Sequence, residues 1–588
     1  MSPLTQSHVV RFATFELDLR CGELRNRGIK VGLQEKPFQV LALLVASPGE
    51  LVTRKQLFEK VWSEFPPDDL NRSLAVAINK LRTALNDKAS TPRFVETVPR
   101  RGFRFIAQLI PVGPVDRKSL LMVLPFENLS KTSDEEYLVD GLTEETISQL
   151  GRVNPQKLGV IARHTAMKYK GTSKTIAEIG EELKLDYLVL GRICRTQNNV
   201  QITVELVETK DQIQLWNQRF DQPIGEIPSV HIVVARQVAQ SLSVELLPQQ
   251  RALIARVGTN NQQAYEMYLQ GRYLWAARTD DAVRGAIAFF EKAIAADTEY
   301  ALAYTGMADC YNVLGYYGSL PPEEAFSKAK TYAAKALSIN NHLAEAHSSV
   351  AFSVLQHEWD WPSAEVAHQR ALHLNSNCSS AYHWYGLDLT QVGRLHDARS
   401  SLQRALVLDP LSVAVRAHLA RVSYFERKYD EAADELRSVM HLEESYVPAK
   451  YFLALVLIQQ GNYAGAVATL EAALKTDPTH PILLSTLAFT HSRRGRKREA
   501  EVICHKLESV GRKRRVDPFF RAFALLDNPA HTDNMFGLFE QAYQEHFGWL
   551  LYLPIDPAFD RLRTKPRFLT FLKKLNPPNE LASAAAVC

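Results

Sequence analysis

The chain has 588 residues, of which 46% are apolar and 23% charged, and its formal net charge is +4. Since a single hydrophobic core stops growing at roughly 250–300 residues, several domains are expected. No apolar run reaches the ~18 residues of a membrane span, and the N-terminus lacks the pattern of a secretory signal. We therefore expect a cytoplasmic protein with no membrane partner. The six cysteines are scattered without a CxxC pair or a His/Cys cluster, which predicts reduced thiols and no metal site.

Positive charge is concentrated near the N-terminus. Residues 1–110 hold 17 Lys or Arg and 11 Asp or Glu, a net charge of +6 that leaves the rest of the chain at −2. The excess is sharpest at 71–104, with eight basic and two acidic residues. A run of charge is most often a solvated surface, so the geometry of the segment must decide its role.

The first hundred residues predict a small α+β domain. Strand-like alternation in VVRFATFELDL comes first, and a helix with Pro37 in its first turn follows. The stretch 53–56, TRKQ, is a capping box that starts a second helix. A third helix is expected over NRSLAVAINKLRTALND, and the alternation in FVETVPRRGFRF at 94–105 predicts a hairpin with basic residues at its tip.

The third helix has two faces of opposite chemistry. At 100° per residue, one side is an apolar stripe that docks on a core, and the other has cations, an amide, a hydroxyl, a valine and no acid. Cations bind phosphates and guanine, an amide binds adenine, and a small apolar group contacts the thymine methyl, so this face predicts a major-groove reader. The alternative is an ordinary solvated helix. The outer face comprises Arg72, Val76, Asn79, Lys80 and Thr83.

Three helices followed by a basic hairpin form the order of a winged helix. The stretches LQEKPFQVLALLVASPGELVTRKQLFEKVW, RSLAVAINKLRTAL and ETVPRRGFRF carry the resemblance. Residues 1–110 resemble the DNA-binding domain of OmpR/PhoB-type regulators, in the variant found at the N-terminus of ToxR- and CadC-like proteins. The resemblance implies a third helix in the major groove and a wing in the minor groove. It implies backbone contacts from Arg72, Ser73 and Thr97, base contacts from Val76 and Lys80, and a phosphate contact from Arg82.

The wing departs from the family at one position. Pro99 stands where response regulators carry an arginine, so either Arg100 or Arg101 is expected to take the minor-groove role. The family precedent is tandem binding to direct repeats about one helical turn apart, which implies a dimer on promoter DNA.

After a linker at 111–117, residues 118–248 alternate strands and helices, which predicts an α/β domain. VLPFENLS, DGLTEETISQL and LDYLVLGRI resemble the TolB N-terminal-like domain that accompanies tetratricopeptide arrays in bacterial regulators and some nucleotide cyclases. No cyclase catalytic domain, phosphate-cradling loop or convergent polar site is recognisable. The expectation is therefore a protein without enzymatic activity and without a cofactor.

Small residues recur along the last half of the chain. Ala371, Ala405, Val439 and Ala473 follow one another at intervals of 34 residues, the period of tetratricopeptide repeats. About seven repeats are expected over 262–510, and a helical cap over 511–588. Such arrays bind peptides or partner domains on a concave surface, and ordinary packing between repeats is the alternative role for residues placed there. The expected partner-binding residues are Arg421, Tyr424, Phe425 and Tyr451.

These patterns predict a multidomain, mostly α chain with an N-terminal winged helix, a central α/β domain and a C-terminal α-solenoid. The resulting hypothesis is a transcriptional regulator similar to HilA-like regulators, which reads double-stranded DNA and uses the repeats as a sensor or interaction module. The alternative is a non-enzymatic scaffold whose winged helix serves protein contact.

Overall fold

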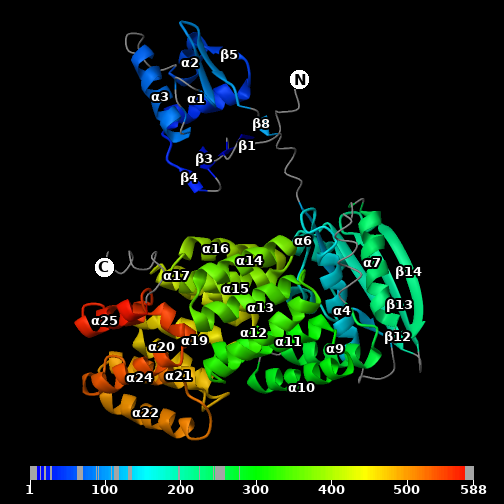
Figure 1. Cartoon of the computed structure of the whole chain (residues 1–588), viewed down its shortest axis with the longest axis vertical. Coiled ribbons are helices and arrows are strands. Elements are labelled where there is room, and N and C mark those ends of the chain that lie inside the picture. The colour runs from blue at the N-terminus through cyan, green and yellow to red at the C-terminus, as the bar shows by residue number, and fades with distance from the viewer. Residues whose placement is uncertain are drawn as a thin grey trace. The chain divides into compact units, whose positions relative to one another are not determined.

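The chain divides into two units, Met1–Arg117 and Lys118–Cys588, each with its own hydrophobic core. Figure 1 shows the elements of both units. The computed structural model describes residues 9–575, with gaps at 13–14, 19–21, 27–28, 63–69, 86, 88, 90–91, 108, 111–117, 130–135, 196–198, 224–225, 243, 245–257 and 277–278.

In its described residues, the first unit packs three helices between two antiparallel sheets. One sheet has the strand order β4-β3-β2-β1-β8, and the other has the order β5-β7-β6. The elements are β1 (Val9–Phe12), β2 (Phe15–Asp18), β3 (Glu23–Asn26), β4 (Ile29–Val31), α1 (Glu35–Ala46), β5 (Leu51–Thr53), α2 (Arg54–Val61), α3 (Leu70–Leu85), β6 (Val95–Val98), β7 (Gly102–Phe105) and β8 (Leu109–Ile110).

Local chemistry explains two features of this unit. The capping box predicted at Thr53 is confirmed, since its side chain accepts from the backbone of Gln56 while the Gln56 side chain accepts from the Thr53 backbone. In the hairpin of β6 and β7, Gly102 faces β5 so closely that a Cβ atom would lie 2.1 Å from the Val52 carbonyl oxygen. A glycine is therefore required where the hairpin joins the third strand.

The second unit begins with a six-stranded mixed sheet. Its order is β11-β9-β12-β13-β14, with β10 beside β12; β11, β9 and β12 are parallel, and β12, β13 and β14 are antiparallel. The elements are β9 (Ser119–Val123), β10 (Glu127–Asn128), α4 (Glu136–Gly151), β11 (Leu158–Val160), α5 (Arg163–Met167), α6 (Ile176–Leu183), β12 (Tyr187–Arg195), β13 (Asn199–Glu208), β14 (Gln214–Pro223) and α7 (Ile227–Ser241).

Antiparallel helix pairs make up the rest of the unit. The pairs are α9 (Gln262–Ala276) with α10 (Asp280–Ala296), α11 (Ala301–Tyr316) with α12 (Pro322–Ile339), α13 (Ala344–Ser353, extended by a π-helical turn, η5, Val354–Glu358) with α14 (Trp361–Leu374), α15 (Ser379–Gln391) with α16 (Leu395–Leu408), α17 (Val413–Phe425) with α18 (Tyr429–Leu442), α19 (Val447–Gln459) with α20 (Tyr463–Leu474), and α21 (Pro481–Arg493) with α22 (Lys497–Gly511). Then come α23 (Pro518–Ala524), η6 (Pro529–His531), α24 (Thr532–Gln544), η7 (Gly548–Tyr552), η8 (Pro557–Leu562) and α25 (Pro566–Lys574).

The small residues of the 34-residue period lie where paired helices approach closely. Ala371, Ala405 and Val439 are fully buried. The predicted fold class is confirmed: a mostly helical multidomain chain with an N-terminal α+β unit, a central α/β domain and helical repeats. Within the part of the chain that the structure describes, no helix is long and apolar enough to cross a membrane.

The α/β domain and the first repeats share one continuous hydrophobic core. A single buried cluster runs from Leu121 in β9 to Ala346 in α13. Polar contacts extend this interface to later repeats. Examples are Arg152 to Glu345 (3.0 Å), Asn377 Nδ2 to the Gly151 carbonyl (2.9 Å), Thr165 Oγ1 to Asp409 (2.6 Å) and Lys168 to Glu443 (3.0 Å).

A buried histidine joins three helices of this shared core. His231 on α7 lies 3.1 Å from the Thr146 hydroxyl on α4 and 3.1 Å from the Tyr265 hydroxyl on α9. The Thr146 hydroxyl already donates to the Leu142 carbonyl, so its oxygen accepts a hydrogen bond from the Nδ1–H group of His231. This arrangement suits the neutral ring, and burial lowers the pKa of His231 to about 3.

Acid should therefore weaken the shared core. The folded-state pKa of His231 lies below the unfolded value of 6.5, so its contribution is complete above pH 6.5 and is lost as pH falls toward 3. The full slope of about 1.4 kcal/mol per pH unit applies only once the unfolded histidine is protonated, so we expect a loss of about 2 kcal/mol between pH 6.5 and 4.5. The check is chemical denaturation of wild type and His231→Gln, whose amide retains a donor and an acceptor but does not titrate. Parallel pH profiles for the two proteins would contradict this account.

Candidate nucleic-acid interface

The predicted outer face of α3 is exposed. Val76 is 47% exposed, although it lies on a helix whose opposite stripe, Leu74, Ile78, Leu81 and Leu85, is buried. Arg72, Asn79, Lys80 and Thr83 are also exposed, and Ser73 is half-buried. The helix thus presents a row of cationic, amide and hydroxyl groups around one apolar side chain.

Two contacts hold this face in place without neutralising its charge. The Lys80 ammonium donates to Gln34 Oε1 at 2.7 Å, and the Thr83 hydroxyl donates to the Asn79 carbonyl at 2.9 Å. An amide partner leaves the charge of Lys80 uncompensated, so the ammonium can still attract an anion.

Arg82 lies in a different environment from the other predicted contacts. It is only 8% exposed, and its guanidinium donates to the Val95 carbonyl (2.8 Å) and to the Thr97 hydroxyl (2.8 Å). Arg82 was expected to contact a phosphate, but its side chain points inward, because β6 provides acceptors within its reach. Arg82 fixes α3 to β6, and Thr97, which is exposed, is one end of that link.

Asp87 was missed by the sequence reasoning. It follows the end of α3, and its carboxylate accepts from the backbone N–H groups of Arg93 (2.7 Å), Phe94 (3.2 Å) and Val95 (2.8 Å). These bonds shape the entry into the wing. Its charge was the signal that could have identified it, because residues 71–104 contain eight basic residues and only two acidic ones, of which Asp87 is one.

The wing tip is a tight turn with one strained residue. Arg101 N–H donates to the Val98 carbonyl at 3.1 Å, with Pro99 and Arg100 between them. Arg100 has a φ of +62°, and proline followed by a positive φ is typical of a type II turn. Arg101 is exposed and is also held at its carbonyl, which accepts from Arg54 N–H at 3.1 Å.

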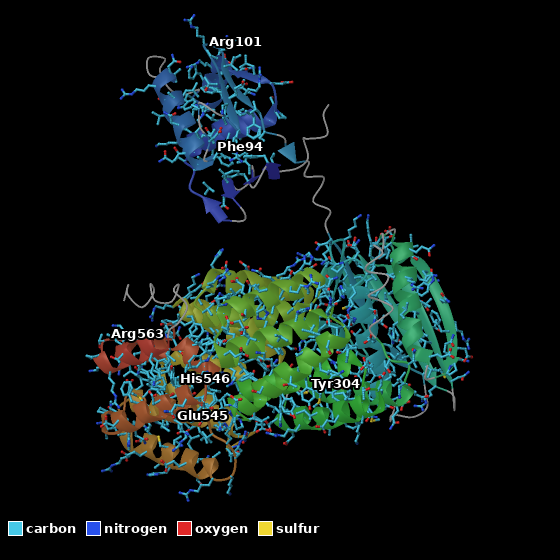
Figure 2. The ribbon with its side chains drawn as sticks, in the orientation of Figure 1. Phe94, Arg101, Tyr304, Glu545, His546 and Arg563 are labelled. Atoms are coloured by element: carbon cyan, nitrogen blue, oxygen red, sulfur yellow. The ribbon has the colours of Figure 1, made fainter. Side chains whose placement is uncertain are left out.

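The three wing arginines are not equivalent. Arg104 forms an ion pair with Glu96 across the hairpin at 3.3 Å, which neutralises part of its charge. Arg100 and Arg101 are exposed, and Figure 2 shows Arg101 at the outer end of the hairpin. The positive charge of the tip therefore belongs mainly to these two residues.

The predicted partner-binding residues of the array are not open to solvent. Arg421 is 3% exposed, and Tyr424, Phe425 and Tyr451 are also buried. The expectation of a free concave surface is corrected here, because the segment 547–563, which contains η7 and η8, covers these side chains. Arg421 donates to the hydroxyls of Tyr316 and Tyr552, both at 3.1 Å, and lies 3.9 Å from the Tyr552 ring centre.

The covering segment contacts successive repeats. Gln391 donates to the Gly548 carbonyl (3.1 Å), Tyr424 donates to Asp556 (2.7 Å), and Arg493 donates to the Ala558 carbonyl (3.1 Å). With Tyr316 on α11, these contacts run from α11 to α21. The chain therefore supplies its own occupant for this face of the repeats.

Three regions of the chain match families of known proteins. Residues 28–105 match the family model "Transcriptional regulatory protein, C terminal", and residues 117–228 match "HilA/YgeH-like transcriptional regulator, second domain". Residues 426–475 and 457–517 match "Tetratricopeptide repeat". The chain combines an OmpR/PhoB-type domain, a HilA-like second domain and tetratricopeptide repeats.

Three relatives show how far the likeness extends. The transcriptional regulator HilA of Salmonella typhimurium is 24% identical over 431 residues, which cover 72% of this chain and 75% of HilA. The cholera toxin homolog transcriptional activator of Vibrio parahaemolyticus is 38% identical over 96 residues, 16% of this chain and 32% of that protein. A putative adenylate cyclase 3 of Rhizobium meliloti is 29% identical over 162 residues, 28% of this chain and 27% of that protein.

Proposed function

We propose that this OmpR/PhoB-type domain makes the chain a sequence-specific, duplex-DNA-binding transcriptional regulator. The observation that carries the proposal is the outer face of α3, which is exposed, free of acids and built around Val76 and Lys80. In this proposal Arg72, Ser73 and Thr97 contact the backbone and set the register. Val76, Asn79, Lys80 and Thr83 lie against base edges in the major groove.

The inward position of Arg82 supports a positioning role. Its bonds to Val95 and Thr97 link α3 to β6, so the helix and the wing keep a fixed spacing. A reader that inserts a helix in one groove and a hairpin in the next needs such spacing. We propose that Arg82 acts on DNA through this link.

We assign the minor-groove role to Arg101. Its backbone is held on both sides, by Val98 and by Arg54, whereas Arg100 occupies the strained position of the turn. Pro99 is part of that turn and stands where response regulators have an arginine. In this proposal Arg101, two residues later, supplies the missing positive charge. A narrow minor groove has enhanced negative potential that attracts an arginine.

Replacing Arg101 with alanine should weaken DNA binding about tenfold and lower the salt slope by about one, as expected for a lost contact to the charged backbone and groove. The measurement is fluorescence anisotropy titration of full-length protein with labelled duplex at several salt concentrations. Two changes in the same hairpin serve as controls. Arg100→Gly fits the positive φ, and Arg104→Ala removes a cation already paired with Glu96. Both should reduce DNA affinity less than Arg101→Ala does. An equal loss of affinity from all three variants would refute the assignment of the minor-groove role to Arg101.

The function itself is tested by selecting bound fragments from sheared genomic DNA with purified full-length protein. Enrichment of a motif repeated at a spacing of about one helical turn is the expected result for a tandem reader. Recovery of fragments without a shared motif would favour the alternative, an interaction scaffold whose winged helix serves protein contact.

We propose a non-enzymatic role for the second unit, in which the HilA-like domain and the repeats act together as a sensor or interaction module. The shared hydrophobic core supports joint action, because neither part can shift without disturbing the other. Since the segment 547–563 covers Arg421 and its neighbours, a protein partner would bind elsewhere on this unit.

A further inference from the structure

Among the described residues, the six-stranded sheet of the HilA-like domain is closed at one edge and open at the other. At the β11 edge, Asn377 Nδ2 donates to the Leu158 carbonyl at 2.8 Å, and Ala162 N–H donates to the Leu408 carbonyl at 2.7 Å. At the opposite edge, β14 pairs with β13 on one side, and no other strand among the described residues pairs with it. Figure 1 shows β14 along the outer rim of the domain. Such an edge presents unpaired N–H and C=O groups to any further strand.

The open edge lacks most of the devices that keep edge strands apart. Protected edges are short, carry lysines or are interrupted by proline and bulges. β14 has ten residues and no lysine, and its one proline, Pro223, is the last residue. The irregularity in its pairing with β13 lies at its first residues. Large apolar side chains are exposed beside that end: Ile213 is 53% exposed and Leu215 is 39% exposed.

The charges of β14 lie on the open face of the sheet. Arg219 donates to the Gln201 amide oxygen at 2.6 Å, and Asp221 accepts from the amides of Asn199 and Gln201, both at 3.0 Å. Phe220, between them, points to the opposite, helix-covered face and is buried. The partners of both charged groups in these contacts are neutral amides, so each can still attract an opposite charge.

We propose that two copies of this chain associate by antiparallel pairing of their β14 strands around Phe220. The stretch Gln218–Gln222, QRFDQ, is self-complementary in that arrangement. With Phe220 on the two-fold axis, Arg219 of each copy stands opposite Asp221 of the other, and Gln218 stands opposite Gln222. Opposite charges directly across a strand pair are favourable.

Charge also selects this register. With the axis at Arg219, the two Arg219 side chains stand opposite each other, and with the axis at Asp221 the two Asp221 side chains do so. Like charges directly opposite are destabilising, so both neighbouring alignments are disfavoured. The contact is isologous, as a closed two-fold dimer requires.

The expected dimer is weak and does not depend on DNA. One strand pairing is smaller than the roughly 1,200–2,000 Å² of a standard stable interface, so association should depend on concentration. Sedimentation equilibrium of the full-length protein without DNA, over about 1 µM to 1 mM, should show a reversible monomer–dimer equilibrium.

Charge exchange tests the register. Arg219→Asp and Asp221→Arg each place like charges opposite in both halves of the pair and should raise the dimer Kd about tenfold or more. An equimolar mixture of the two variants restores two opposite-charge pairs, so a heterodimer should form with near wild-type affinity. The double variant on one chain should recover in the same way. Since both side chains are exposed, each variant is expected to keep the wild-type circular dichroism spectrum.

Matched controls lie in the same domain. Lys210→Asp and Asp211→Arg make equal charge changes at exposed positions between β13 and β14, outside the paired stretch, and should leave the dimer unchanged. The proposal is overturned if wild type stays monomeric over the whole range. It is also overturned if the single exchanges dimerise like wild type, or if folded single variants fail to associate when mixed. None of these results bears on DNA binding, so they are separate from the test of the proposed function.

Discussion

A chain that ends after His546 should fail to form a soluble array. The truncation removes the segment that lies against Arg421, including Trp549, Leu550, Leu551 and Tyr552, all nearly or fully buried. At about 1.5–3 kcal/mol for each large apolar side chain, these four contribute about 10 kcal/mol, comparable to the stability of a whole domain. Arg421 would also lose the ring and the hydroxyl of Tyr552 that it contacts. We expect low soluble yield and reduced helical circular dichroism.

A shorter truncation provides the comparison. A chain that ends after Leu575 keeps every contact described for the segment and should melt like full-length protein. Tyr552→Phe separates the ring from its hydroxyl and should lower the free energy of unfolding by only about 1 kcal/mol. A truncation after His546 that retained wild-type helicity and melting temperature would show that the segment is peripheral to the array.

Replacing Asp87 with alanine should unfold much of the DNA-binding domain. The change leaves three N–H groups, those of Arg93, Phe94 and Val95, without their acceptor at the entry to the wing. At about 1–3 kcal/mol for each unsatisfied group, the loss is at least about 3 kcal/mol, a large part of the stability of a small domain. DNA affinity should fall with it, since β6 anchors Arg82. Thermal unfolding of the full-length protein, together with duplex titration, measures both effects.

Asp87→Asn is the matched variant. Its amide retains one acceptor oxygen, so it should recover part of the stability lost in Asp87→Ala. Equal destabilisation by the two variants would mean that the negative charge, and not the hydrogen bonds, holds the wing. Unchanged unfolding in both variants would refute the role assigned to Asp87.

Local patterns in the sequence predicted the elements of the fold. The capping box at Thr53 gives the start of α2, and the stripe of Leu74, Ile78 and Leu81 gives the inward face of α3. The 34-residue period gives the paired helices, because small residues are needed wherever two helices pack closely. These patterns could be recognised in the sequence because each either involves residues within one or two helical turns or repeats at a fixed interval.

Contacts between distant segments were not predictable in this way. The hydroxyls of Tyr316 and Tyr552 lie 3.2 Å apart although 236 residues separate them, and no periodicity specifies such a pair. The family resemblance implied a phosphate contact from Arg82, yet its guanidinium is bonded to acceptors on β6. β14 was missed because its amide-rich sequence lacks the alternating apolar residues that indicate a strand.

The position of the covering segment has a consequence for synthesis of the chain. Domains generally fold as units during translation, starting from the N-terminus, so the DNA-binding domain can be complete while most of the chain is still unmade. The repeats cannot close in the same order, because residues after 546 must reach back to helices as early as α11. Until then the side chains that this segment buries stay exposed, and the nascent chain should be a chaperone client. Synthesis that stops late would leave a folded DNA-binding domain attached to an aggregation-prone array.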